Sequence, residues 1–307
     1  MAAQAADSAG SPSPPLQLTL PTDWQQVAQQ GATPAPATTD APTSPISDYF
    51  SNWFARVEQA QASQPHWMTP LVTVTPRLEQ EVRYDQYWEH LGNGANVDQW
   101  DSGKGLELIP TDTNEVLLNP PPYLERYNKK PANGWNDWGF LTIKQRLLSA
   151  NEENGDYILT AFLGVQAPSG NVAFTNHAWV VTPTIAGGWG WGPFDVQSTL
   201  GIQIPTDHPS KIGTAAAWNT ALQLHLATYF WPEFETNITH WYEGARGNKT
   251  QVFLTPGIIF GRFHLNERLS ASIGVGYQVA VSPKLVLDPA ITPTYNHAWL
   301  VSGRVAF

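Results

Sequence analysis

Ionisable side chains recur at every second position near residue 80. They are Arg77, Glu79, Glu81, Arg83 and Asp85. Successive side chains of a strand point to opposite faces, so these five would lie on one face of a ribbon. Apolar side chains such as Val82, Tyr84 and Trp88 fill the alternate positions. The segment from Leu71 to Trp88 is therefore predicted to be one long strand with a charged face and an apolar face.

A row of opposite charges on the inside of a barrel could do either of two things. In a narrow barrel the charges would pair across strands, fill the interior and fix the register. In a wide barrel they would line a pore and select ions. The same inward parity is predicted for Lys144, Arg146, Asp195, Glu235 and Arg304. The ladder is favoured because about twelve strands leave modest room inside.

Catalysis would need more than one well-placed group. His225 could act as a base only with a serine or a second carboxylate within hydrogen-bond reach, and no spacing in the sequence indicates one. The chain contains no cysteine, which excludes disulfides and cysteinyl metal sites. No catalytic residue, metal or cofactor is predicted, and the chain is not expected to be an enzyme.

Alternating segments continue from His66 to the end of the chain, and their connections alternate in length. The short ones are 110–113, 151–155, 190–193, 230–232 and 263–267, and longer ones separate them. Short turns at one end and long loops at the other are typical of outer-membrane barrels, with the short turns periplasmic. The predicted fold is all-β, a closed antiparallel up-and-down barrel of about twelve strands. The alternative is a soluble sandwich, which has no reason to separate its loops by length.

Composition agrees with a membrane barrel. The 307 residues include 14 Trp, 12 Phe and 10 Tyr, enough for aromatic girdles at both membrane boundaries, although carbohydrate-binding sandwiches are also rich in tryptophan. The net charge of −10, without a basic run, argues against nucleic acid as a partner. No apolar stretch is long enough for a membrane helix.

The first part of the chain differs from the rest. Residues 1–46 form a low-complexity arm rich in Pro, Ala, Ser and Thr, residues 47–65 an amphipathic helix with a linker, and residues 66–307 the barrel. Met1 precedes no apolar signal segment, so a signal peptide is expected to have been removed before this numbering. Eight residues are predicted to dock the arm and helix: Leu16, Leu18, Leu20, Trp24, Tyr49, Phe50, Trp53 and Phe54.

Several local motifs resemble known families. A last strand ending in Trp299, Val305 and Phe307 is similar to the C-terminal signature of bacterial outer-membrane barrels. The motifs at 106–110, 121–123, 139–142, 168–171 and 255–257 resemble the outer-membrane family named for the meta-pathway of phenol degradation. This resemblance implies passage of small solutes, aromatic molecules among them, with outer-membrane lipid around the barrel.

The arm leaves a second hypothesis open. Its roughly 45 residues would reach on the order of 140 Å when extended, whereas the apolar band of a barrel is about 25 Å tall. The arm could plug its own lumen, or enter the lumen or rim of a neighbouring copy. The alternative to a solute channel in the bacterial outer membrane is thus an extracellular filament of self-assembled subunits.

Overall fold

The computed structural model describes residues 45–101, 104–282 and 294–307. The chain divides after Asp48 into two units, and the second, residues 49–307, contains the barrel. The predicted docking residues Leu16, Leu18, Leu20 and Trp24 lie outside the described residues.

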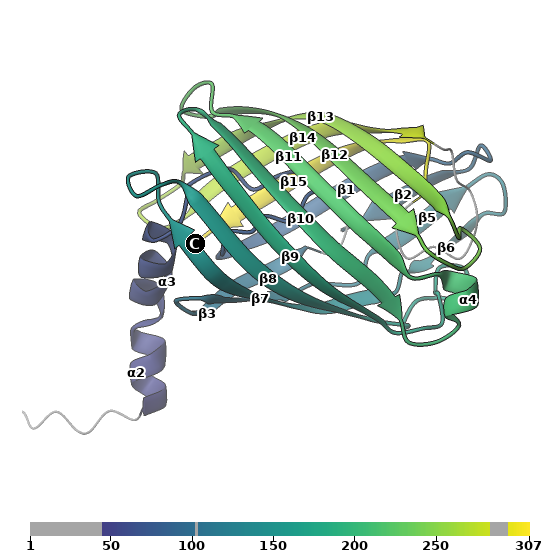
Figure 1. Ribbon diagram of the computed structural model, residues 1–307, viewed down its shortest axis with the longest axis horizontal. Coiled ribbons are helices and arrows are strands. Elements are labelled where there is room, and N and C mark those ends of the chain that lie inside the picture. Colours follow the sequence, from purple (N-terminus) through teal and green to yellow (C-terminus); the bar gives the residue numbers. More distant parts are fainter. Residues whose placement is uncertain (1–44, 102–103, 283–293) are drawn as a thin grey trace, which may run out of the picture. The chain divides into compact units, whose positions relative to one another are not determined.

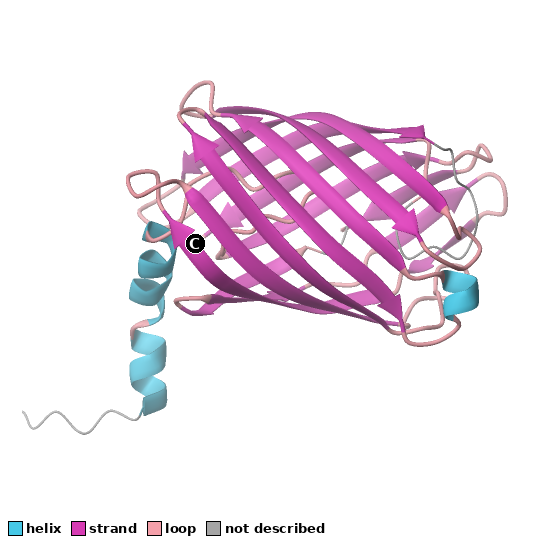
Figure 2. Ribbon diagram, viewed as in Figure 1, coloured by secondary structure: helices cyan, strands magenta, loops and turns pink. Residues whose placement is uncertain are grey.

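Twelve strands of the described ranges form a closed barrel, each antiparallel to its neighbours (Figures 1 and 2). They are β1 (Glu81–His90), β3 (Gly105–Thr111), β4 (Asn114–Leu118), β7 (Trp138–Ala150), β8 (Tyr157–Ala167), β9 (Val180–Trp191), β10 (Phe194–Pro205), β11 (Ala215–Leu224), β12 (Phe230–Trp241), β13 (Lys249–His264), β14 (Ser270–Ser282) and β15 (His297–Ala306). Closure is between β15 and β1, in a register from Glu81 opposite Ala306 to His90 opposite His297. The predicted fold class is confirmed.

Three further strands in the described ranges extend the sheet near the long loops. They are β2 (Asn96–Trp100), β5 (Tyr123–Tyr127) and β6 (Ala132–Trp135). Along β1, residues 81–83 pair with β3 and residues 86–90 pair with β2. The wall beside β1 therefore has two panels, β3–β4 at the short-turn end and β2–β5–β6 at the long-loop end.

Short and long connections lie at opposite ends, as predicted. One boundary was wrong: the turn placed at 230–232 lies at 225–229. Residues Phe230, Trp231 and Pro232 pair with Phe260, Ile259 and Ile258 of the next strand. Proline alone did not mark the turn, because a strand tolerates a residue without an N–H where that position donates no ladder bond.

The two faces of the wall are opposite in character to those of a soluble protein. Large apolar side chains are exposed outside, as Val82 (49%), Leu200 (51%) and Ile273 (53%) show on three different strands. Charged side chains such as Lys144 and Glu235 are fully buried inside. An apolar outer band around a polar interior is the arrangement of a membrane barrel.

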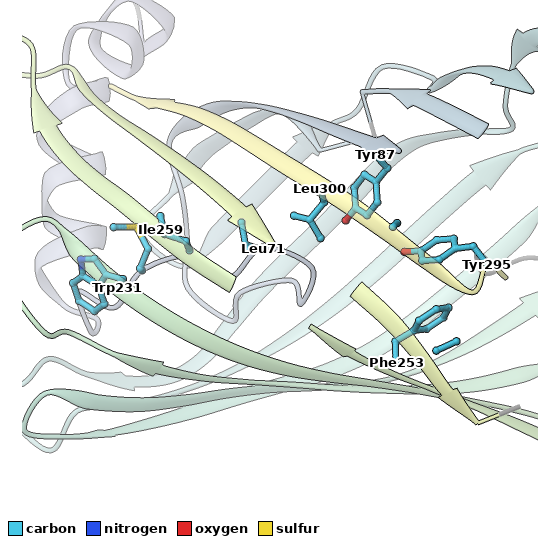
Figure 3. Close-up of a cluster of buried hydrophobic side chains, with 10 residues drawn as sticks. Leu71, Tyr87, Trp231, Phe253, Ile259, Tyr295 and Leu300 are labelled. Atoms are coloured by element: carbon cyan, nitrogen blue, oxygen red, sulfur yellow. The ribbon is translucent and has the colours of Figure 1, made fainter. Parts of the chain in front are cut away.

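The predicted long strand is the main correction. β1 begins only at Glu81, and residues 66–80 are not a strand but run inside the barrel. We call residues 66–80 the inner segment. Figure 3 shows its Leu71 beside Ile259 and Leu300 of the wall, and these three share a buried apolar cluster. Both parities of the segment are enclosed, so alternation there did not reflect two faces of a sheet.

The described residues include three helices, α2 (Pro45–Ser51), α3 (Trp53–Ala62) and α4 (Pro209–Ile212). Val57 and Ala60 of α3 pack against Leu78 and Ile109. The Asn151 side chain donates to the carbonyl of Ala62 over 3.2 Å, which fixes the end of α3 near the short turns. No helix in the described ranges is long and apolar enough to cross a membrane.

Closure of the wall predicts heat-modifiable migration in gels. A closed barrel has no strand edge at which detergent-driven unfolding can start, so unboiled protein should stay compact in dodecyl sulfate. We expect the unboiled sample to migrate faster than the boiled one. Equal migration of both samples, with a monomer that stays soluble without detergent, would contradict a membrane barrel.

Candidate functional site

The inner segment enters and leaves the barrel at the short-turn end. At the entry, the Nδ1 atom of His66 lies 2.9 Å from Glu152 Oε2 in the turn after β7. At the exit, the carbonyl of Gln80 accepts from the backbone N–H of Phe307 over 3.0 Å. Gln64 joins the two legs, because its side chain donates to the carbonyl of Leu78 (2.8 Å) and accepts from its N–H (2.9 Å). The segment is thus a loop that turns back inside the lumen.

Two carboxylates of β12 bind backbone N–H groups of this loop. Glu235 accepts from Val72 at 2.7 Å through Oε1 and from Thr73 at 2.6 Å through Oε2. Glu233 accepts from the N–H of Leu71 at 3.1 Å. Hydrogen bonds to an ionised acceptor are stronger than neutral ones, and here they replace the strand pairing that these residues lack.

Three guanidinium groups bind the backbone carbonyls of the same stretch. Arg83 of β1 and Arg304 of β15 both donate to the carbonyl of Pro70, at 3.0 and 2.8 Å. Arg262 of β13 donates to the carbonyl of Trp67 at 2.6 Å. A proline backbone offers only its carbonyl, so two donors on Pro70 complete its hydrogen bonding.

The outgoing leg is held by charges on β3, β4 and β7. The carboxylate of Glu115 accepts from the N–H of Glu79 at 2.6 Å. The Lys144 ammonium lies 2.8 Å from Glu115 and 3.8 Å from Glu107, and it donates to the carbonyl of Arg77 at 3.2 Å. Burial of this lysine is thereby matched by two carboxylates and a carbonyl.

On β8 and β10 the contacts to the loop are uncharged. Gln197 accepts from the Thr75 hydroxyl at 2.7 Å and donates to the carbonyl of Met68 at 2.8 Å. The Thr160 hydroxyl donates to the carbonyl of Pro76 at 2.6 Å. The inner segment is therefore bound by charged groups on one side of the lumen and by neutral groups on the other.

All ten charged residues singled out in the sequence are buried. Arg77 and Glu79 belong to the inner segment and not to the wall, which corrects their predicted place. The two ion pairs within this set join near neighbours in sequence, Arg77 to Glu79 (3.0 Å) and Arg83 to Asp85 (2.8 Å). Most of the other charges bind backbone groups, so the set forms neither a ladder between strands nor an open ring around a pore.

Two of the ten charged residues contact groups outside the inner segment. Arg146 donates to the carbonyl of Ala60 in α3 at 2.7 Å, and Asp195 accepts from Gln197 at 3.0 Å.

Five residues that complete these contacts were not predicted from the sequence. They are Glu107, Glu115, Gln197, Glu233 and Arg262. Parity could have found Glu233, since it lies two residues from Glu235 on one strand. Arg262 escapes a parity argument because the pairing of β13 with β14 shifts register between Gly261 and Phe263.

Among the described residues, at least three cavities adjoin the inner segment, and the smallest of them, about 30 Å³, lies beside β13 to β15. The luminal cavity, about 320 Å³, lies between Val74 and side chains of β7 to β11, among them Thr184 and Thr199. The mouth cavity, about 530 Å³, lies at the short-turn end and is lined by residues that include Trp67 and Asp195. Thr199 and Asp195 both face inward from β10, and Gln197 lies between them.

The mouth cavity contains the histidine considered as a base. The ring of His225 is parallel to Trp231, with centroids 3.9 Å apart. Partial burial acts to raise the pKa of Glu152, but hydrogen bonds from the His66 ring and backbone hold it below its usual range. The described residues include no group of three or more side chains placed to hold a metal.

The described docking residues lie on α2 and α3. The Tyr49 hydroxyl donates to the carbonyl of Pro110 at 2.9 Å, and Trp53 packs on the cluster around Leu78. Phe50 is exposed, while the guanidinium of Arg268 lies 4.5 Å from the centre of the Phe54 ring. Docking of the arm itself stays a prediction.

The C-terminal residues close the wall. Trp299 and Val305 of β15 are exposed on its outer face. Phe307 follows the strand and binds Gln80 at the base of the inner segment.

No family model and no curated protein matches this chain. Solved structures with some likeness include the NanC porin, at 8% identity and a TM-score of 0.46 over 74% of this chain and 98% of that one. An outer-membrane channel from Pseudomonas putida F1 has 13% identity and a TM-score of 0.49, over 74% of this chain and 94% of the channel. The KdgM porin has 6% identity and a TM-score of 0.43, over 74% and 99%. The resemblance to the phenol meta-pathway family stays a prediction.

Proposed function

We propose that this protein is a bacterial outer-membrane barrel that passes small solutes along the β8–β11 side of its lumen. The proposal depends on one observation: the luminal cavity lies beside the inner segment on the side where the neutral groups of Gln197 and Thr160 hold it, and the mouth cavity reaches the short-turn end of the same strand β10. The apolar outer face supports placement in a membrane. The aromatic solute implied by the sequence resemblance is not needed for this proposal.

Gln197 is the proposed barrier between the cavities. Its amide spans from β10 to the inner segment through Thr75 and Met68, in the layer between Asp195 and Thr199. A solute that moves from one cavity to the other must displace this amide or the backbone that it binds.

Energetics favour opening on this side. A neutral hydrogen bond contributes about 0.5–1.5 kcal/mol net, and one to a charged group about 1.5–3 kcal/mol. The bonds from Gln197 and Thr160 are of the first kind, whereas those from Glu235, Arg304 and Arg262 are of the second. The inner segment should therefore separate from β8 and β10 while it stays bound to β12, β13 and β15.

Replacing Gln197 by alanine is expected to raise conductance. The shorter side chain removes both hydrogen bonds to the loop and joins the two cavities, so we expect a roughly twofold to fivefold larger single-channel conductance in planar bilayers, which corresponds to about 0.4–1 kcal/mol. Gln145→Ala is the matched control, since Gln145 is exposed on the outer face of β7. No conductance or liposome swelling for either the natural protein or Gln197→Ala would contradict solute passage.

The filament alternative stays a prediction about residues 1–46. Electron microscopy of the purified protein with and without these residues tests it. Filaments formed only by the full chain would favour assembly through the arm, and dispersed particles in both samples would favour the channel.

A further inference from the structure

Uncharged hydrogen-bonding side chains line part of the luminal cavity, beside apolar groups such as Val74 and Phe162. Thr142 of β7, Thr182 and Thr184 of β9, and Thr199 of β10 contribute hydroxyls on one side of the lumen. A hydroxyl can donate one hydrogen bond and accept two, so it can bind another hydroxyl in either sense. Gly201 faces Thr184 across the β9–β10 pair, and a Cβ there would collide with the Thr184 hydroxyl oxygen. Glycine at 201 thus leaves room for that hydroxyl.

Two acceptors in the lining lack a donor. The side-chain oxygens of Asn119 and Gln203 are enclosed, and neither has a hydrogen-bond partner among the described residues. A buried carbonyl oxygen without a donor is unfavourable by about 1–3 kcal/mol. Rotation of either amide towards the cavity would let an occupant that brings donors relieve this penalty, whereas an apolar occupant would not.

Charge in and around the cavity disfavours ionic occupants. Lys104 is the sole ionisable residue among the described lining of the luminal cavity, which disfavours cations. The mouth cavity carries Glu152, Asp156 and Asp195 besides Arg262 and three histidines, and its carboxylates disfavour the entry of anions from the short-turn end. Moving any ion from water into such a site has a desolvation penalty that an uncharged solute avoids.

We propose that the luminal cavity binds a small uncharged polyhydroxylated solute of about monosaccharide size. Its volume of about 320 Å³ lies at the lower end of the range for small-molecule sites, roughly 300–1,000 Å³. The proposal also identifies the class of solute that would pass through the lumen, and in that respect it rests on the proposed function. Binding itself does not require that the solute cross.

The test compares three sugars with the same ring and different charge. Saturation-transfer NMR on the full chain in detergent micelles would measure binding of glucose, glucuronate and glucosamine. We expect glucose to bind, and each charged analogue to bind at least about fivefold more weakly, which corresponds to about 1 kcal/mol. The double variant Thr184→Val with Thr199→Val keeps the side-chain shapes and removes two hydroxyls. It should weaken glucose binding about tenfold.

Thr236→Val is the matched control, because Thr236 lies on β12 at the parity opposite to the buried Glu235 and Asn237. It should bind glucose as the natural protein does, and heat-modifiable migration would verify that all variants fold. Equal binding of glucuronate, or unchanged glucose binding by the double variant, would overturn this proposal. Glucose binding without any conductance would instead overturn the proposed passage and leave the binding site standing.

Discussion

Replacing Glu235 by glutamine is expected to release the tip of the inner segment from β12. The carboxylate accepts two backbone N–H groups, one on each oxygen. Glutamine has the same shape but only one acceptor, and its amide N–H₂ would face a second donor. The loss of one charge-assisted bond and the new donor–donor contact should lower the free energy of unfolding by about 2–4 kcal/mol.

Two measurements check this expectation. Urea unfolding in detergent micelles should show the lower stability, and planar bilayers should show larger and noisier currents than those of the natural protein. Glu153→Gln removes the same charge from an exposed turn and serves as control. If Glu235→Gln has the same free energy of unfolding and the same current noise as this control, the carboxylate does not hold the inner segment.

Replacing Lys144 by methionine should have the largest effect on stability. The ammonium is fully buried, and its loss leaves the carboxylates of Glu107 and Glu115 facing each other without a cation. Removing one partner of a buried ion pair typically destabilises a protein by about 3–5 kcal/mol. We expect a much smaller folded fraction in unboiled gels and a lower urea midpoint.

A second substitution separates lost charge balance from lost packing. Adding Glu115→Gln to Lys144→Met removes one of the two unpaired charges, and the glutamine oxygen can still accept from the N–H of Glu79. The double variant should be more stable than the single one. If the free energy of unfolding of Lys144→Met lies within about 1 kcal/mol of that of the natural protein, the buried ammonium does not balance the charges of Glu107 and Glu115.

The sequence predicted the wall well because a barrel strand repeats one simple rule. Each strand must place apolar side chains towards lipid and polar ones towards the lumen, so parity alone separates exposed Leu200 from buried Asp195. Connection lengths then predicted the strand number and the separation of short and long connections at opposite ends of the barrel. Bulges and short panels escaped this reasoning, because β2, β5 and β6 are too short to show a clear alternation.

The inner segment could not be recognised by the same rule. Its alternation resembles that of a strand, but its backbone partners are side chains such as Glu233 and Glu235, more than 160 positions away in the sequence. No local pattern encodes such partners. Pro70 and Pro76 were the available signals, since each interrupts any ladder of N–H donors.

For the charged residues, the sequence predicted burial in the lumen but not their partners. Charged residues of one parity were expected to pair with one another or to line a pore. Arg304 and Glu235 instead bind peptide groups. Every residue has a peptide group, so the residue types in a sequence do not indicate which peptide groups a charged side chain will bind.

The inner segment enters and leaves the barrel at the same end. It is therefore a re-entrant loop that blocks the lumen, and it does not thread through the barrel. A chain that crossed the lumen from end to end could leave only by unthreading or by opening the wall. This loop can withdraw towards the short-turn end while α3 and β1 hold its two ends and the seam between β1 and β15 stays closed. The proposed channel would thus open and close again without losing the inner segment.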